Sequence, residues 1–487
     1  MEQILNFPNG VGQIQLANSS GAISSGNPLA VDIGGSTVNF NVASGNLNVS
    51  LTSGNVSILN SGSLVSPSNP FPVTFSGNAV NIGYSDTASL DAFSRLRVSN
   101  PYTLFDAQLN YGLEPMTHNN ITVGGATIQP NTNESCAVLT VNGTLNDKAV
   151  RQTKQYFRYQ PGKSQMLMQT FVMGNPTSGV RKRIGYFDNN NGLFLEQIAP
   201  TIDTTGLRFV VRSSTSGSPV DVAVDSTAWN IDKMDGSGPS GVNLSMAKSQ
   251  ILFIDLEWLG VGRVRFGFVI DGSIYYAHQV LNTNYLDKVY MTTADLPVRG
   301  EIENTSGGNI DSMKMICTSV NSEGGFSKVG FPFSVGNGAA IKTLTTRRPV
   351  LSIKPNTTYN SVTNRMEYNI TDITVFSKEN TAYYEIVLNG SLNSGVFTNV
   401  SSGYSSMSYD TNSTVISGGI VVACGYSVAG GPGENAIGGI TSQVTKTPFG
   451  TNYDATDSDV LTVVATCIEP SPKTSSVGAV FSWQEIR

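Results

Sequence analysis

The chain has 487 residues, of which only 13% are charged, against about 25% in an average soluble protein. Its formal net charge of −6 and pI near 5.1 argue against a protein that binds nucleic acid through a basic surface, because such affinity comes from Lys and Arg that neutralise phosphates. No run of 18 apolar residues could cross a membrane. The sequence therefore predicts neither a nucleic-acid partner nor membrane insertion.

The first 90 residues are repetitive and nearly uncharged, with no Lys or Arg before Arg95. Residues 38–63 hold three near-copies of a strand and a turn, VNFNVASGN, LNVSLTSGN and VSILNSGS, in which apolar and polar residues alternate. A strand this short cannot bury its apolar face alone, so it needs stacked neighbours from its own chain or from other chains. We expect residues 1–90 to form a β-rich shaft or collar that attaches the protein to a larger assembly and trimerises.

Two further blocks follow the repeats. Residues 91–335 are dense in hairpin signals, and a glycine-rich linker near 334–340 separates them from alternating strands in residues 336–487. Asn, Ser, Thr and Gly replace the missing charges and favour turns and strands over helices. The sequence thus predicts an all-β protein with two β-sandwich or jelly-roll-like domains after the N-terminal segment.

The register of one hairpin in the central block can be predicted from its residues. A turn at Gly260 pairs Leu256 with Val264 on one face and Asp255 with Arg265 on the other, so apolar residues meet apolar ones and an acid meets a base. A second, two-residue turn at Asp271-Gly272 extends the hairpin to a three-stranded meander.

Asp255 and Glu257 form a candidate acid pair on this hairpin. Two residues apart on one strand face, their α-carbons are about 6.6 Å apart, a separation close to the one that glycoside hydrolysis requires. The predicted register places Arg265 and Arg263 opposite them, which would lower the pKa of both carboxyls, so we favour ion pairs over catalysis. His278 falls level with Arg265 in the same register, without a serine or cysteine beside it.

A basic cluster extends from Arg151 to Arg183, and no acidic residue occurs between Arg151 and Asp188. Its members are Arg151, Lys154, Arg158, Lys163, Arg181, Lys182 and Arg183. The cluster is a candidate docking patch for an acidic partner or an anionic glycan. The alternative is a set of strand faces whose charges pair with carboxylates elsewhere.

The four cysteines, Cys136, Cys317, Cys424 and Cys467, lie far apart without metal-ligand spacing. Each sits in an apolar, strand-like run, where a thiol behaves as a small buried hydrophobe. We therefore expect no disulfide framework and no zinc site at these cysteines. For the chain as a whole we predict no metal site, no cofactor and no catalytic residue.

Several blocks of the sequence resemble a known family. They include DAFSRLRVSNPYTLFD (91–106), RQTKQYFRYQPGKSQ (151–165), RKRIGYFDNNNGLFLE (181–196), WNIDKMDGSGPSG (229–241) and WLGVGRVRFGFVIDG (258–272). These blocks, with RRPVLSIKP and the closing SWQEIR, are similar to virion structural proteins of tailed bacteriophages, common among phages of cyanobacteria. The resemblance covers roughly residues 91–487 and implies a place in the particle, without an activity or catalytic residues.

Together these features predict a non-enzymatic component of a phage virion, assembled in the host cytoplasm as a fibre, spike or collar appendage. We expect a homotrimer that contacts other virion proteins through residues 1–90 and projects its β-domains for bracing or for host contact, including contact with a surface glycan. Two alternatives remain: a glycan-cleaving tailspike that uses Asp255 and Glu257, and a capsid decoration protein.

Overall fold

The computed structural model describes residues 17–18, 21–22, 59–60, 63–64, 89–98, 100–199, 206–327, 329–338, 341–429 and 449–487. The chain divides into two compact units, Met1–Ile82 and Gly83–Arg487. In the first unit the described residues form two short hairpins: β1 (Ala17–Asn18) pairs with β2 (Gly21–Ala22), and β3 (Leu59–Asn60) pairs with β4 (Ser63–Leu64). The predicted repeats at 38–58 lie outside the described residues, so the shaft or collar stays a prediction.

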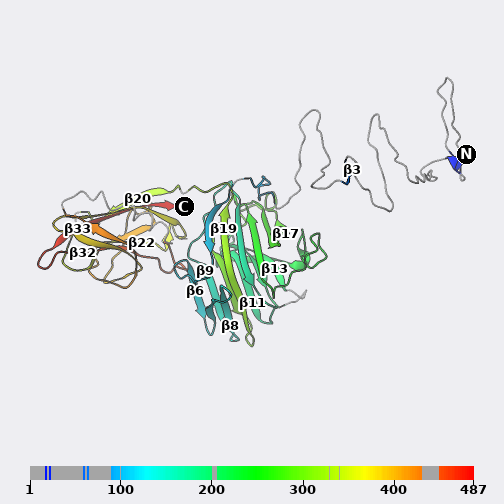
Figure 1. Ribbon diagram of the computed structural model, residues 1–487, viewed down its shortest axis with the longest axis horizontal. Helices are drawn as coiled ribbons and strands as arrows, with labels where there is room; N and C mark the ends of the chain where they lie inside the picture. The colour runs from blue at the N-terminus through cyan, green and yellow to red at the C-terminus, as the bar shows by residue number, and fades with distance from the viewer. Residues whose placement is uncertain are drawn as a thin grey trace, which may run out of the picture. The chain divides into compact units, whose positions relative to one another are not determined.

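The second unit contains two pairs of antiparallel sheets (Figure 1), so the predicted all-β class is confirmed. The helical structure described there is a single 3-10 turn, η1 (Ser226–Ala228). No helix in the described ranges has the length and apolar character that a membrane span requires.

The first pair of sheets uses residues 102–322. Its eight-stranded sheet has the order β17-β16-β15-β10-β19-β8-β7, with β5 also pairing with β19. The strands are β5 (Tyr102–Ala107), β7 (Thr127–Asn131), β8 (Cys136–Asn142), β10 (Gln165–Val172), β15 (Gln250–Leu256), β16 (Val264–Ile270), β17 (Ser273–Val280) and β19 (Ile310–Ser322).

The facing seven-stranded sheet has the order β14-β13-β12-β11-β18-β9-β6. Its strands are β6 (His118–Val123), β9 (Lys148–Thr153), β11 (Val180–Phe187), β12 (Gly192–Gln197), β13 (Leu207–Ser213), β14 (Val220–Asp225) and β18 (Val298–Asn304). Both sheets contribute to one hydrophobic core, so this region is a β-sandwich.

Residues 331–486 form a second sandwich, from a four-stranded and a six-stranded sheet around a separate core. The four-stranded sheet contains β20 (Phe331–Gly336), β21 (Lys342–Leu344), β25 (Glu367–Ser377) and β33 (Ser475–Ile486). The six-stranded sheet contains β22 (Arg348–Pro355), β26 (Ala382–Leu388), β28 (Thr398–Asn399), β29 (Met407–Asp410), β31 (Ile420–Ser427) and β32 (Leu461–Cys467). Two small hairpins join β23 (Thr358–Tyr359) to β24 (Val362–Thr363) and β27 (Ser391–Leu392) to β30 (Ile416–Ser417).

Strand pairing places the start of the second sandwich before residue 336. β20 pairs along its whole length with β33, from Phe331 opposite Glu485 to Gly336 opposite Val480. A strand belongs to the sheet that satisfies its backbone hydrogen bonds. Residues 331–336 are therefore part of the C-terminal sandwich. The glycine-rich sequence instead predicts a domain boundary between residues 335 and 336, which lies inside this strand.

Alternation along the strands builds the first core. In β10, Leu167 and Phe171 enter the core between the sheets, whereas Met166 packs in a smaller cluster on the other face of its sheet. Successive side chains of a strand point to opposite faces, which explains how the run QMLMQTFV serves both clusters.

The predicted hairpin register is confirmed. Leu256 faces Val264 and Asp255 faces Arg265, and the turn at Asp271-Gly272 has both residues at positive φ, +50° and +78°, as a type I′ turn requires. The alignment continues correctly only to the middle of β17.

A β-bulge then shifts the register of β17. Phe266 pairs with His278 but the adjacent Gly267 pairs with Tyr276, so Ala277 is the extra residue. The predicted position of His278 opposite Arg265 is therefore wrong. The bulge turns His278 to the face that carries Phe266.

The four cysteines are free, and two of them differ from the prediction. Cys136 and Cys467 are buried, as expected, whereas Cys317 and Cys424 are exposed. Both exposed thiols belong to strands, β19 and β31, whose alternation places one residue in two on the outer face. An apolar sequence run around a cysteine did not reveal which face it occupies.

Candidate functional site

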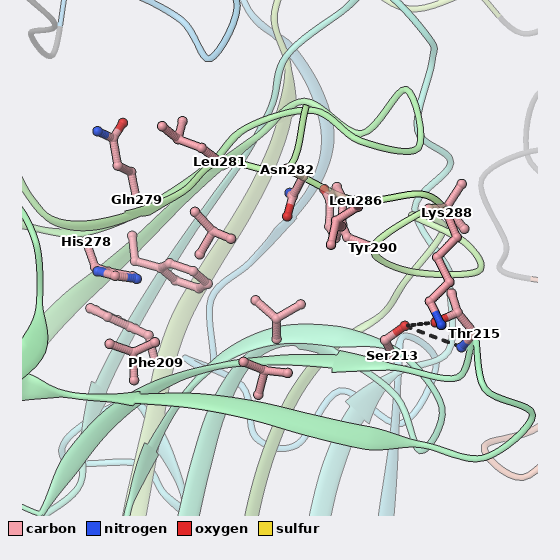
Figure 2. Close-up of a pocket in the computed structure, with 16 residues that line it drawn as sticks. Phe209, Ser213, Thr215, His278, Gln279, Leu281, Asn282, Leu286, Lys288 and Tyr290 are labelled. Atoms are coloured by element: carbon pink, nitrogen blue, oxygen red, sulfur yellow. Dashed lines mark hydrogen bonds between the residues drawn. The ribbon is translucent and has the colours of Figure 1, made fainter. Parts of the chain in front are cut away.

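An apolar groove of about 440 Å³ opens at one edge of the first sandwich. Figure 2 shows its walls: strands β13 and β14 on one side, and β17 with the loop of residues 281–290 on the other. Phe209 and Val211 of β13 line this space together with Phe266 and Val280, and the rings of Phe209 and Phe266 stack 4.6 Å apart.

The groove is open because the sandwich ends there. β14 and β17 are the terminal strands of their sheets, so neither has a further strand beside it in the described sheets. The inward-facing Val222 of β14 keeps 62% of its surface exposed, whereas a valine at this position would ordinarily be covered by the opposite sheet.

Polar groups lie at both ends of the groove. His278 accepts a hydrogen bond at Nδ1 from the Asn230 backbone N–H at 3.2 Å, which leaves the proton on Nε2. Burial lowers the pKa of His278 below its usual 6.5, so the ring is neutral at pH 7. At the other end, Lys288 extends from the loop towards Ser213 and Thr215 (Figure 2).

A second, polar pocket of about 420 Å³ lies on the other side of the same loop. It shares Leu281 and Asn282 with the groove, and its remaining lining residues are Ala92, Phe93, Ser94, Glu257, Arg263, Thr283 and Tyr285. The loop of residues 281–290 therefore forms a wall of both hollows. One predicted candidate, Glu257, lies in this pocket.

Asp255 is the centre of a buried polar cluster. Its Oδ2 accepts hydrogen bonds from Arg97 at 2.6 Å, from Tyr276 at 3.0 Å and from Arg265, and its Oδ1 accepts one from Ser164 at 2.7 Å. The carboxylate has no exposed surface. The predicted ion pair with Arg265 is confirmed, and the structure adds Arg97 as a second cationic partner.

Arg97 belongs to residues 89–98, which we call the lead-in segment. Arg265 donates to the carbonyl of Leu90 at 2.7 Å, and the Ala92 N–H donates to Ser164 at 3.3 Å. The lead-in segment is thus fixed to β10, β15 and β16 by groups that also surround Asp255.

Glu257 differs from its neighbour on the strand. It is half-buried, and one carboxylate oxygen accepts the Arg263 backbone N–H at 2.9 Å. Burial raises the pKa of Glu257, and this effect outweighs the hydrogen bond and charge of Arg263, which act in the opposite direction. The predicted lowering of its pKa is therefore wrong, because the register revealed the arginine opposite but not the burial.

The basic residues on β11 lie within charged strand faces. Arg183 is buried and contacts Glu196 at 2.6 Å and Glu301 at 3.2 Å, whereas Lys182 is buried against Asp311 at 2.6 Å. The partly buried Arg181 pairs with Glu303. These three residues match the alternative of strand faces paired with carboxylates elsewhere.

The other four basic residues are also covered to some extent. Arg151 is buried and donates to the Leu113 carbonyl at 2.8 Å, and Lys163 donates to the Gly325 carbonyl at 2.8 Å. Lys154 and Arg158 are partly buried. The seven residues therefore do not gather into one exposed patch, and a docking role for any of them stays a prediction.

His118, the other histidine, is buried at the start of β6 with its ring 5.8 Å from that of Phe105. Burial, helped by the charge of Arg151, lowers the pKa of His118 from 6.5 to about 3. Among the described residues, no group of three or more His, Cys, Asp or Glu side chains is arranged to hold a metal ion.

The low pKa of His118 predicts a loss of stability in acid. The unfolded chain binds a proton at this histidine between pH 6.5 and about 3 while the folded chain does not, so stability falls as the pH falls through this window. Each pH unit should cost about 1.4 kcal/mol from this group. Urea unfolding of the wild type and of His118→Gln across this range should show a flatter profile for the variant, and parallel profiles would contradict the assignment.

Comparison with known proteins gives structural similarities only. No family profile and no curated protein sequence matches the chain. Among solved structures, a family 16 endo-glucanase from Bacteroides ovatus is 10% identical, with a TM-score of 0.30, over 45% of this chain and 99% of its own. Peanut lectin is 11% identical, with a TM-score of 0.29, over 46% of this chain and 98% of its own. The carbohydrate recognition domain of Emp47p is 14% identical over 45% of this chain and 94% of its own length, with a TM-score of 0.29. Similarities of this size decide neither what this chain binds nor whether it is an enzyme.

Proposed function

We propose that this chain is a non-enzymatic structural component of a phage particle, a fibre, spike or collar appendage. Its N-terminal segment would attach to other virion proteins and trimerise, and its two sandwiches would project from the particle. The end of the first sandwich that carries the loop of residues 281–290 is the part shaped for contact, because two hollows meet there.

The position of Asp255 is the observation that carries the non-enzymatic part of this proposal. Glycoside hydrolysis needs two carboxyl groups that reach the scissile bond, one of them able to donate a proton. Asp255 has no exposed surface, and its oxygens already accept hydrogen bonds from two arginines, a tyrosine and a serine. The acid pair seen in the sequence is therefore better explained as structural, because buried Asp255 cannot serve as the second carboxyl group beside Glu257.

The sequence blocks within residues 91–487 support the particle location, since they resemble virion proteins. A capsid decoration protein would share the same two sandwiches, so position in the particle distinguishes it from an appendage. Mass spectrometry of purified particles should detect the chain, and gold-labelled antibodies against it should mark the tail or collar. Its absence from particles would overturn the proposal, and labelling spread over the capsid would favour the decoration protein.

An activity assay tests the non-enzymatic part separately. The purified full chain, incubated with capsular polysaccharide or lipopolysaccharide from the host, is expected to release no new reducing ends. Glu257→Gln should behave like the wild type, because there is no activity to lose. Release of sugar ends by the wild type, abolished in Glu257→Gln, would assign the chain to the glycan-cleaving class instead.

A further inference from the structure

The polar pocket beside the lead-in segment has a lining that selects the chemistry of its ligand. Arg263, Asn282 and Thr283 each use a side-chain donor inside the protein. The guanidinium of Arg263 donates to the Ala92 carbonyl at 2.9 Å and to Ser94 at 3.2 Å, and the Asn282 amide donates to the Gly262 carbonyl at 2.7 Å. Thr283 likewise donates to the Val261 carbonyl at 2.9 Å.

Acceptors remain on the same wall. A carboxylate offers about four lone-pair sites, and the hydrogen bond from Arg263 N–H to Glu257 occupies one of them. Asn282 also lines the pocket, and its side-chain amide contains an acceptor oxygen. A ligand that supplies hydrogen-bond donors, as hydroxyl groups or ammonium groups do, can therefore pair with these acceptors.

The charges of the pocket favour an uncharged ligand. One acidic side chain, Glu257, and one basic side chain, Arg263, line it, so neither an anion nor a cation finds a net opposite charge there. The lead-in segment also keeps its own charges paired, since Arg95 contacts Asp91 at 2.7 Å.

Tyr285 supplies an apolar platform at the mouth. It keeps 77% of its surface exposed, so its ring can cover the C–H face of a ligand. The pocket volume of about 420 Å³ lies in the range of small-molecule sites.

From this combination we propose that the pocket formed by Glu257, Asn282 and Tyr285 binds a neutral, hydroxyl-rich ligand, a sugar residue of a glycan. Hydroxyl groups donate to Glu257 and Asn282, and the apolar face of the sugar ring packs on Tyr285. The inference rests on the proposed function, since it names what the projecting sandwich would contact.

Saturation-transfer NMR on the full-length protein tests the site with four probes: glucose, galactose, mannose and N-acetylglucosamine, each at about 50 mM because single sugars bind weakly. We expect transfer to the ring protons of at least one of them. Tyr285→Ala and Glu257→Gln should each weaken that binding by about tenfold or more, through loss of the platform and of the charged acceptor. Lys288→Ala is the matched control, because Lys288 lies on the same loop but lines the apolar groove, and it should leave sugar binding unchanged.

The other outcomes are equally informative. No transfer to any of the four sugars, or transfer that survives both Tyr285→Ala and Glu257→Gln, would overturn the site. Binding of tetramethylammonium in place of the sugars would assign the pocket to amines and overturn it as well. If no sugar binds but the chain is found in the particle tail, the proposed function is supported and the sugar site is wrong. If a sugar binds but purified particles lack the chain, the proposed function is wrong and the sugar site is supported.

Discussion

Replacing Asp255 with asparagine is expected to lower the free energy of unfolding by about 3–5 kcal/mol, the range typical of a broken buried ion pair. The wild-type carboxylate balances Arg265, which is completely buried, and Arg97, whose side chain is 15% exposed. Asparagine keeps the size and one acceptor but removes the charge, so a guanidinium is left in the interior without its counterion. Urea unfolding followed by circular dichroism measures the change.

The same replacement should loosen the lead-in segment before the rest of the fold. Asp255 holds Ser164 and Arg265 in place, and these two side chains contact Ala92 and Leu90 of that segment. Limited proteolysis under native conditions should therefore cut Asp255→Asn within residues 89–98 faster than it cuts the wild type. Hydrogen exchange of the same backbone amides should rise in parallel.

Glu257→Gln is the matched control, two residues further along the chain. Its half-buried carboxylate accepts the Arg263 backbone N–H, and a glutamine oxygen can accept the same bond, so we expect a change below about 1 kcal/mol. The double variant Asp255→Asn/Arg265→Met should recover part of the loss, because it removes the unpaired buried charge. A loss below about 1 kcal/mol for Asp255→Asn alone would show that the cluster does not fix this part of the fold.

A second large effect is expected at Glu301, on the face of the seven-stranded sheet that points away from the core. Glu301 is fully buried and contacts Arg299, Lys148 at 3.1 Å and Arg183 at 3.2 Å. Glu301→Gln leaves two buried arginines short of negative charge, which should cost about 3–5 kcal/mol at neutral pH. Thermal and urea unfolding both measure this loss.

The effect of Glu301→Gln should depend on pH. Burial alone would raise the pKa of Glu301, but the charges of Arg299, Lys148 and Arg183 outweigh burial and hold the pKa well below its usual 4.5. A carboxyl with a depressed folded-state pKa contributes its full stability above its unfolded pKa and loses it as the pH falls further. The difference between wild type and variant should therefore be largest near neutral pH and shrink on acidification below about pH 4.5.

Glu303→Gln provides the control on the same strand and face. Glu303 pairs with Arg181, and their side chains are 19% and 29% exposed, so water can replace the interaction. We expect a loss of about 1 kcal/mol or less. Equal losses for Glu301→Gln and Glu303→Gln would contradict the special importance of the buried network.

Local sequence patterns predicted the elements that depend on neighbouring residues. The hairpin of β15 and β16 has the expected register because only one alignment brings Leu256 opposite Val264 and Asp255 opposite Arg265. The hairpin of β11 and β12 also forms around the Asn-rich turn, with Phe187 opposite Gly192. In both cases turn chemistry and alternation act within a few residues of each other.

The candidate site was harder to predict because it depends on contacts distant in sequence. The bulge at Ala277 brings His278 to the groove, and the alternation of residues in β17 does not predict it. The Ala277 carbonyl accepts hydrogen bonds from the backbone N–H groups of Ile231 and Asp232, which lie in a separate loop. Likewise, the alternation of Val220, Val222 and Val224 along β14 does not show that the opposite sheet stops short of this strand. The residues around Tyr285 also do not indicate that the lead-in segment, distant in sequence, lines the same pocket.

The sequence by itself determined the all-β class, the two strand-rich blocks after residue 90 and the pairing of adjacent strands, because hydrophobic alternation and turn residues act over short distances along the chain. Only the tertiary structure decided which charges are buried, which sheet edges stay open and where the pocket of Glu257, Asn282 and Tyr285 forms. Arg97 and Asp255 are 158 positions apart in the chain, and Arg263 and Ala92 are 171 apart. Contacts between residues so far apart depend on how the two sheets pack against each other and on where each sheet has its edge strand. No local pattern of residues specifies either of these.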